Sequence, residues 1–110
     1  MINVIAHPAL SYKIDRVEDH RNNAQIRGKA ASVIVRNLGT VTARVNNVVI
    51  RAGDVLELDA GQPIVKFENG VMHIIPLAME LETQLTFDVT EAAAPSAVTW
   101  VQLVFNSFKQ

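Results

Sequence analysis

The sequence predicts an all-β fold: an antiparallel β-sandwich or small jelly roll of seven to eight strands with an extended polar N-terminal arm. Apolar residues recur at every second position over most of the chain, which is the period of a half-buried strand. Turn-forming pairs such as Asn46-Asn47 and Asn69-Gly70 separate these alternating segments. The strands therefore follow one another at roughly 8–12-residue intervals, a spacing typical of sandwiches and barrels.

The first part of the chain, residues 1–31, is expected to form an edge segment and arm. Residues 1–14 alternate, but Pro8 lacks an amide donor, which suits an edge position. Residues 15–31 are polar and show no sustained period of 2 or 3.6, which predicts a long loop or arm. Such loops are unusual in small domains, so we expect its own domain or a neighbouring subunit to hold it. Residues 32–110 then form the β-sandwich domain.

The stretch from Ser32 to Asp59 is predicted to form short strands folded back on each other. Its turns are expected at Leu38-Gly39, Asn46-Asn47 and Ala52-Gly53. Asn tolerates positive φ better than most residues, so Asn46-Asn47 suits a two-residue hairpin. This turn would place Val45 opposite Val48 and gather the apolar residues in one row. The row consists of Val41, Ala43, Val45, Val48 and Ile50.

Residues 64–76 predict a second hairpin around Asn69-Gly70, because a type I′ turn requires positive φ at both of its central positions. Pairing Glu68 with Val71 separates the side chains into two rows. The row expected to be buried consists of Val65, Phe67, Met72 and Ile74. The outward row consists of Lys66, Glu68, Val71 and His73.

Residues 79–89 alternate with almost no interruption, which predicts a strand with one solvated face. The apolar row consists of Met79, Leu81, Leu85, Phe87 and Val89, joined by Thr83. Residues 91–96 are read as a connection. The last strand, residues 97–108, is apolar on both faces, so it is central in the sheet or meets another subunit on one side. Trp100 and Phe108 are its candidate interface residues, because aromatic side chains are enriched at interface cores.

The composition indicates one globular domain of 110 residues, with 49% hydrophobic and 19% charged residues and no cysteine. The start lacks the basic region and apolar core of a signal peptide, and the apolar runs are too short to cross a membrane. Residues 1–51 carry eight basic residues against three acidic ones, whereas residues 52–110 carry two against eight. The charges either interleave on the folded surface or complement another copy of the chain.

Neither a metal site nor a catalytic site is predicted. His7, His20 and His73 are too scattered for zinc, and Asp54, Glu57 and Asp59 lack the pattern of a calcium loop. The chain has no nucleophile elbow, phosphate-binding loop or cysteine nucleophile, so we expect no enzyme and no cofactor.

Three arginines, Arg36, Arg44 and Arg51, are predicted to lie on the outward rows of adjacent strands. No aromatic residue accompanies them on those strands, so specific binding of nucleic acid is not expected. They are instead candidates for a subunit interface with copies of the chain.

Three runs, residues 35–40, 45–48 and 50–54, separate short strands by Asn-x-Gly, Val-Asn-Asn and Ile-x-x-Gly-Asp turns. This pattern resembles small β-sandwich proteins of bacteriophage particles. The resemblance carries no catalytic residue. It implies a capsid, vertex or decoration protein, or a jelly-roll capsid subunit, held by its N-terminal arm and repeated by symmetry.

These observations lead to the expectation of a non-enzymatic structural subunit of a phage virion, assembled in the host cytoplasm. It would associate with itself and with other capsid or assembly proteins, and not with a membrane. The alternative is a small recognition module that binds carbohydrate or a protein ligand, for which Trp100 is the candidate aromatic platform. A cupin-like enzyme is a third alternative, against which the scattered histidines argue.

Overall fold

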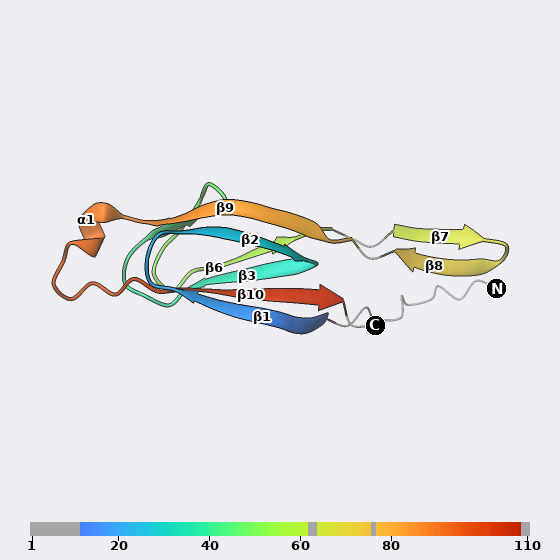
Figure 1. The fold of residues 1–110 in the computed structure, drawn as a ribbon, viewed down its shortest axis with the longest axis horizontal. Helices are drawn as coiled ribbons and strands as arrows, with labels where there is room; N and C mark the ends of the chain where they lie inside the picture. Colours follow the sequence, from blue (N-terminus) through green and yellow to red (C-terminus); the bar gives the residue numbers. More distant parts are fainter. Residues whose placement is uncertain (1–11, 62–63, 76, 109–110) are drawn as a thin grey trace.

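A computed structural model of the chain describes residues 12–61, 64–75 and 77–108. The described residues form ten strands and one helical turn (Figure 1). The strands are β1 (Tyr12–His20), β2 (Ala24–Ala30), β3 (Ser32–Asn37), β4 (Ala43–Val45), β5 (Val48–Ile50), β6 (Val55–Asp59), β7 (Ile64–Glu68), β8 (Val71–Ile75), β9 (Met79–Phe87) and β10 (Val101–Phe108). The helical turn is α1 (Val89–Ala92).

The strands form two four-stranded antiparallel sheets and a separate hairpin. The β10 sheet has the order β1-β10-β3-β6, and the β9 sheet has the order β2-β9-β4-β5. The third sheet consists of β7 and β8 alone and projects from one end of the two larger sheets (Figure 1). The prediction of an all-β antiparallel fold is therefore confirmed.

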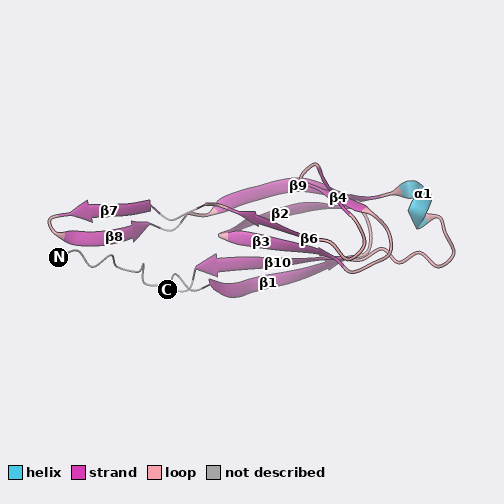
Figure 2. Cartoon of the chain, turned by 180° about the vertical axis from the view of Figure 1, so that it is seen from behind, coloured by secondary structure: helices cyan, strands magenta, loops and turns pink. Residues whose placement is uncertain are grey.

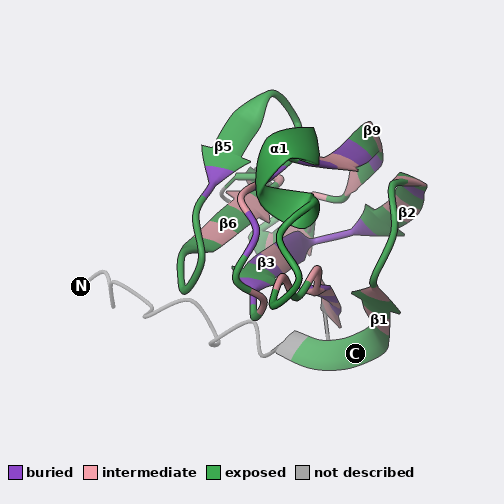
Figure 3. Ribbon diagram, turned by 90° about the vertical axis from the view of Figure 1, so that its left-hand side faces the viewer, coloured by how far each residue is buried: buried purple, intermediate pink, exposed green. Residues whose placement is uncertain are grey.

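The two larger sheets share one hydrophobic core. Viewed along the long axis, the buried residues lie between the sheets and the outer faces are mostly exposed (Figure 3). Side chains that alternate along each strand supply this core, as expected for strands with one solvated face. The largest of the fully buried side chains are Phe105, Ile26, Ile50, Leu85 and Leu103. This arrangement is consistent with the predicted sandwich.

The prediction of a long loop or arm over residues 15–31 is wrong, because β1 and β2 occupy most of this segment and raise the number of strands to ten. β1 pairs with β10, and β2 pairs with β9, each at an edge of its sheet. Ile26 and Ala30 of β2 lie in the core, so residues before position 32 contribute to the same core as the later strands. The inner row of β1 is charged and β2 contains few large apolar residues, so neither strand shows a clear apolar alternation in the sequence. Residues 1–11 lie outside the described part.

The hairpin at Asn46-Asn47 is confirmed, including its register. Both asparagines have positive φ, 52° and 62°, and Val45 lies opposite Val48. However, the prediction that the strands of residues 32–59 pair in succession is wrong. β3 pairs with β6 in the β10 sheet, whereas β4 and β5 belong to the β9 sheet. The chain therefore crosses between the sheets after Asn37 and returns after Ile50.

The turn and register of the second hairpin are also confirmed. Asn69 and Gly70 have φ of 51° and 76°, and Phe67 lies opposite Met72. The expected burial of this row is wrong, because Phe67 is 69% exposed and the other three members are only half-buried. The hairpin lies beyond the end of the larger sheets, where no other described strand forms a second layer over it (Figure 2).

β9 and β10 occupy the places predicted for them. The inner row of β9 lies in or beside the core, except that Val89 belongs to α1 and is 81% exposed. β10 is a central strand between β1 and β3.

Asp88 caps the helical turn by accepting a hydrogen bond from the Glu91 amide. No helix in the described part of the chain is long and apolar enough to cross a membrane.

Candidate functional site

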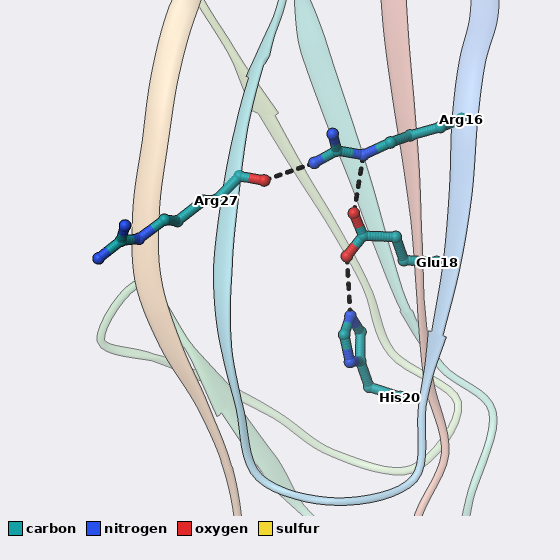
Figure 4. Close-up of polar contacts among 4 residues, drawn as sticks. All are labelled: Arg16, Glu18, His20 and Arg27. Atoms are coloured by element: carbon teal, nitrogen blue, oxygen red, sulfur yellow. Dashed lines mark hydrogen bonds and ion pairs between the residues drawn. The ribbon is translucent and has the colours of Figure 1, made fainter.

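A charged cluster lies on the inner row of β1, where the neighbouring strands place apolar residues. Arg16, Glu18 and His20 oppose Phe105, Leu103 and Val101 of β10 across the ladder. The Glu18 carboxylate lies 2.7 Å from Nε of Arg16 and 2.9 Å from Nε2 of His20 (Figure 4). One carboxylate thus bridges a guanidinium and an imidazole at the edge of the core.

Arg16 connects the two sheets. Its Nη2 atom donates a hydrogen bond to the Arg27 carbonyl on β2 (Figure 4). Its guanidinium also stacks on Phe105, with Cζ 4.0 Å from the centre of the ring. Gly28 leaves the room for this contact, because a Cβ atom there would lie 2.6 Å from the Phe105 ring. The cluster therefore closes the side of the core where β1 and β2 are both edge strands.

The contacts of the cluster are those of a bridge between the two sheets. A carboxylate beside an imidazole also orients the ring as in an acid–base pair, and nucleophilic catalysis by such a pair would require a nucleophile within reach. In the part of the chain that the structure describes, no hydroxyl group is hydrogen bonded to His20. Sequence reasoning missed this cluster, although Arg16, Glu18 and His20 already stand at every second position.

Replacing Arg16 by alanine is expected to lower the free energy of unfolding by about 1–2 kcal/mol, because it removes the stacking on Phe105 and the hydrogen bond between sheets. Arg27→Ala is the matched control. The Arg27 side chain is 72% exposed and forms a surface pair with Glu82, which is expected to contribute less than about 0.5 kcal/mol. Urea denaturation measures both. Equal losses would contradict the bridging role of Arg16.

Trp100 is not a free aromatic platform. The Arg21 guanidinium lies 4.2 Å from its ring centre, and its Nε1 atom donates a hydrogen bond of 2.8 Å to Asp19. The side chain is half-buried by its own chain. The side chain of Phe108, the other aromatic candidate, lies outside the described part. Stacking of a sugar on Trp100 would have to displace Arg21 from the face that it covers.

The three candidate arginines are exposed but do not form one surface. Arg36 lies on β3 in the β10 sheet, whereas Arg44 lies on β4 in the β9 sheet, and Arg51 follows β5. The prediction of adjacent strands is therefore wrong for Arg36, because the chain changes sheet between β3 and β4. It holds for Arg44 and Arg51, because β4 pairs with β5, the strand that Arg51 directly follows.

The charges of the two halves interleave on the β9 sheet, one of the two alternatives drawn from the sequence. Arg27 lies 3.2 Å from Glu82, and Lys29 lies opposite Glu80 in the ladder between β2 and β9. The uneven distribution of charge along the sequence is thus partly cancelled within one copy of the fold.

Two of the three acidic residues considered for calcium stabilise turns, and the third, Glu57, lies within β6. Asp54 accepts a hydrogen bond from the Arg51 amide, and Asp59 accepts one from the Gly61 amide. His7 lies outside the described residues, and His73 lies on the hairpin, far along the fold from His20 (Figure 1). Within the described ranges, no three His, Asp or Glu side chains are grouped as metal ligands.

No protein-family model, curated protein or solved structure matches this chain. Its function is therefore argued from the surfaces that the fold presents.

The outer face of the β10 sheet carries exposed apolar side chains beside the charged Glu57 and Asp19. Ile14, Val17 and Val55 are exposed there, and Ile34 and Val104 are half-buried between them. Arg36 lies on the same face, opposite Gln102 and Val55. This surface corresponds to the second apolar face that the sequence showed on the last strand.

Among the described residues, the β7–β8 hairpin is a further surface with exposed apolar side chains, and it exposes them on both of its faces. Phe67 is exposed on one face, and Ile64, Val71 and Ile75 are exposed on the other. Its described charges are Lys66 and Glu68, which lie 3.7 Å apart and cancel. An isolated two-stranded hairpin is at best marginally stable in water. Burial of its exposed apolar side chains against a partner would therefore stabilise it.

Proposed function

We propose that this chain is a non-enzymatic structural subunit that acts by self-association and by docking on a larger assembly. The observation that carries the proposal is the β7–β8 hairpin, which extends exposed apolar side chains beyond the end of the shared core. Large exposed apolar surfaces are uncommon on monomeric soluble proteins and mark sites of association. The apolar outer face of the β10 sheet offers a second contact surface.

We propose the virion of a bacteriophage as the assembly, with copies of this chain and other capsid proteins as partners. The turns that resemble those of small phage β-sandwich proteins support this setting, because Asn46-Asn47 and Gly53 adopt the positive φ that such turns require. The elongated fold, with a longest extent of 64 Å and two shorter extents of 22 and 21 Å, is suited to contact several neighbours. The recognition module has less support, since Arg21 covers a face of Trp100.

Self-association is tested by sedimentation velocity over a range of protein and salt concentrations. The wild-type chain is expected to associate as its concentration rises. The Phe67→Ser variant is expected to shift this equilibrium toward the monomer, raising the apparent dissociation constant about tenfold, because truncation of a large aromatic anchor removes most of its contact energy.

Val89→Ser is the matched control for this experiment. Val89 is even more exposed than Phe67 but lies on α1, at the opposite end of the fold from the hairpin (Figure 1). Its variant is expected to associate like the wild-type chain. A wild-type chain that stays monomeric at every concentration and salt condition would contradict the proposed function.

A further inference from the structure

We propose that two copies of the chain join through the edges of their β8 strands, which pair with no described strand other than β7. The two hairpins then form one four-stranded antiparallel sheet with the order β7-β8-β8-β7 across a two-fold axis. This proposal rests on the self-association proposed above and names the element and the occupant. It starts from the observation that β8 (Val71–Ile75) pairs only with β7 among the described residues.

The backbone of β8 presents a complete set of pairing groups at this edge. In a two-residue hairpin the residues flanking the turn, Glu68 and Val71, exchange hydrogen bonds, and the pattern then alternates along the ladder. Met72 and Ile74 therefore direct their N–H and C=O groups away from β7. When a second copy pairs in the antiparallel direction, Ile74 of each copy lies opposite Met72 of the other. The N–H and C=O groups of these two residues then all form hydrogen bonds in both copies.

Other sheet edges carry features that hinder such pairing. β1 has a register shift near its start, and β5 has only three residues. β2 carries Arg27 and Lys29, and β6 carries Glu57 and Asp59. Charges, irregular register and short length are the usual protections of exposed edges. β8, with the sequence VMHII, has none of them.

Charge favours the edge of β8 over the edge of β7. In an antiparallel pair of identical five-residue strands, the central residue lies opposite its own copy. For β7 this residue is Lys66, and two directly opposed ammonium groups destabilise a ladder. For β8 it is His73, which carries no formal charge in its neutral form. Pairing through β8 leaves Lys66 and Glu68 on the two outer strands.

The joined sheet also has one continuous apolar face. Phe67 and Met72 point to the same side of the hairpin, as do Val65 and Ile74. Antiparallel pairing of β8 preserves this alternation, so the rows of the two copies merge. The exposed Phe67 side chains then flank a wider apolar surface, suited to burial within a larger assembly.

Cross-linking tests the register directly, because the chain contains no cysteine. In the proposed sheet His73 lies opposite its copy as a non-hydrogen-bonded pair, with the Cα atoms about 4.5 Å apart, within the range for a disulfide. The full-length His73→Cys variant is expected to form a covalent dimer on mild oxidation. Lys66→Cys is the control, because its copies would be three strand spacings, about 14 Å, apart. Efficient cross-linking of Lys66→Cys instead would overturn the proposal.

A pair of proline variants tests the edge without cysteine. Ile74→Pro removes an amide that faces the free edge of β8, and Val65→Pro removes the equivalent amide of β7, which lies opposite in the hairpin. Neither amide takes part in the ladder between β7 and β8. Ile74→Pro is expected to raise the dissociation constant at least tenfold, whereas Val65→Pro changes it less than threefold. Equal effects would overturn the choice of edge.

Failure of this proposal is distinguishable from failure of the proposed function. If the wild-type chain associates but neither Ile74→Pro nor His73→Cys behaves as expected, the β8 pairing is wrong and self-association stands. The Val17→Lys variant, on the outer face of the β10 sheet, would then identify the other apolar surface as the interface. If the wild-type chain never associates, both proposals are wrong.

Discussion

Replacing Asn37 by alanine is expected to lower the free energy of unfolding by about 2–4 kcal/mol. The Asn37 side chain is fully buried, and its Nδ2 atom donates hydrogen bonds of 2.9 Å to the carbonyls of Val41 and Ile50. Its Oδ1 atom accepts a hydrogen bond of 3.1 Å from the Gly39 amide. The side-chain amide of Asn37 thus stabilises both connections by which the chain passes between the two sheets. A shift of the urea midpoint at constant slope measures the loss.

Asn106→Ala is the control for Asn37→Ala. Asn106 is also buried, but within the described residues its side chain forms one hydrogen bond, of 3.2 Å from Nδ2 to the Ser32 hydroxyl. Its replacement is expected to cost about 1 kcal/mol, the usual net contribution of one hydrogen bond. If both variants lose the same stability, Asn37 contributes only burial, and its three bonds do not hold the crossings.

Local turn chemistry explains why the hairpins could be predicted with their registers. In Asn46-Asn47 and Asn69-Gly70, the residues that tolerate positive φ are adjacent in the sequence and leave a two-residue turn. Such a turn fixes which residues face each other across the ladder. The strands β9 and β10 could also be predicted from their alternation. The inward row of each strand contains large apolar residues that lie in or beside the core.

Pairing between distant strands could not be predicted in this way. The alternation of β3 and β4 is the same whether they are neighbours or lie in different sheets, and the choice depends on contacts such as those of Asn37. The exposure of Phe67 likewise depends on where the hairpin projects.

The charged cluster on β1 was missed for a related reason. Arg16, Glu18 and His20 recur at every second position, as the inward row of a strand does, but they are polar where an inward row is expected to be apolar. The contacts of Arg16 with Phe105 and with β2 explain why this row points inward.

Gly39→Ala is expected to lower the free energy of unfolding by about 3 kcal/mol. The sequence predicted Gly39 as part of a turn, but φ there is not positive, and the requirement for glycine is spatial. A Cβ atom would lie 2.2 Å from the Val98 carbonyl oxygen and 2.8 Å from the Trp100 amide nitrogen. The Leu38 and Gly39 amides both donate to the Trp100 carbonyl, so this segment cannot move away without losing backbone hydrogen bonds.

Gly53→Ala separates close packing from backbone strain. Gly53 has φ of 85°, but a Cβ atom there would meet nothing within 4 Å. Its replacement is expected to cost about 1 kcal/mol, the strain of a left-handed backbone alone. Thermal unfolding is expected to show the larger decrease in Tm for Gly39→Ala. A larger decrease in Tm for Gly53→Ala would mean that the connection after β3 accommodates the added Cβ atom at position 39 by a small shift. The contact with residues 98–100 would then not determine how the chain passes from the β10 sheet to the β9 sheet.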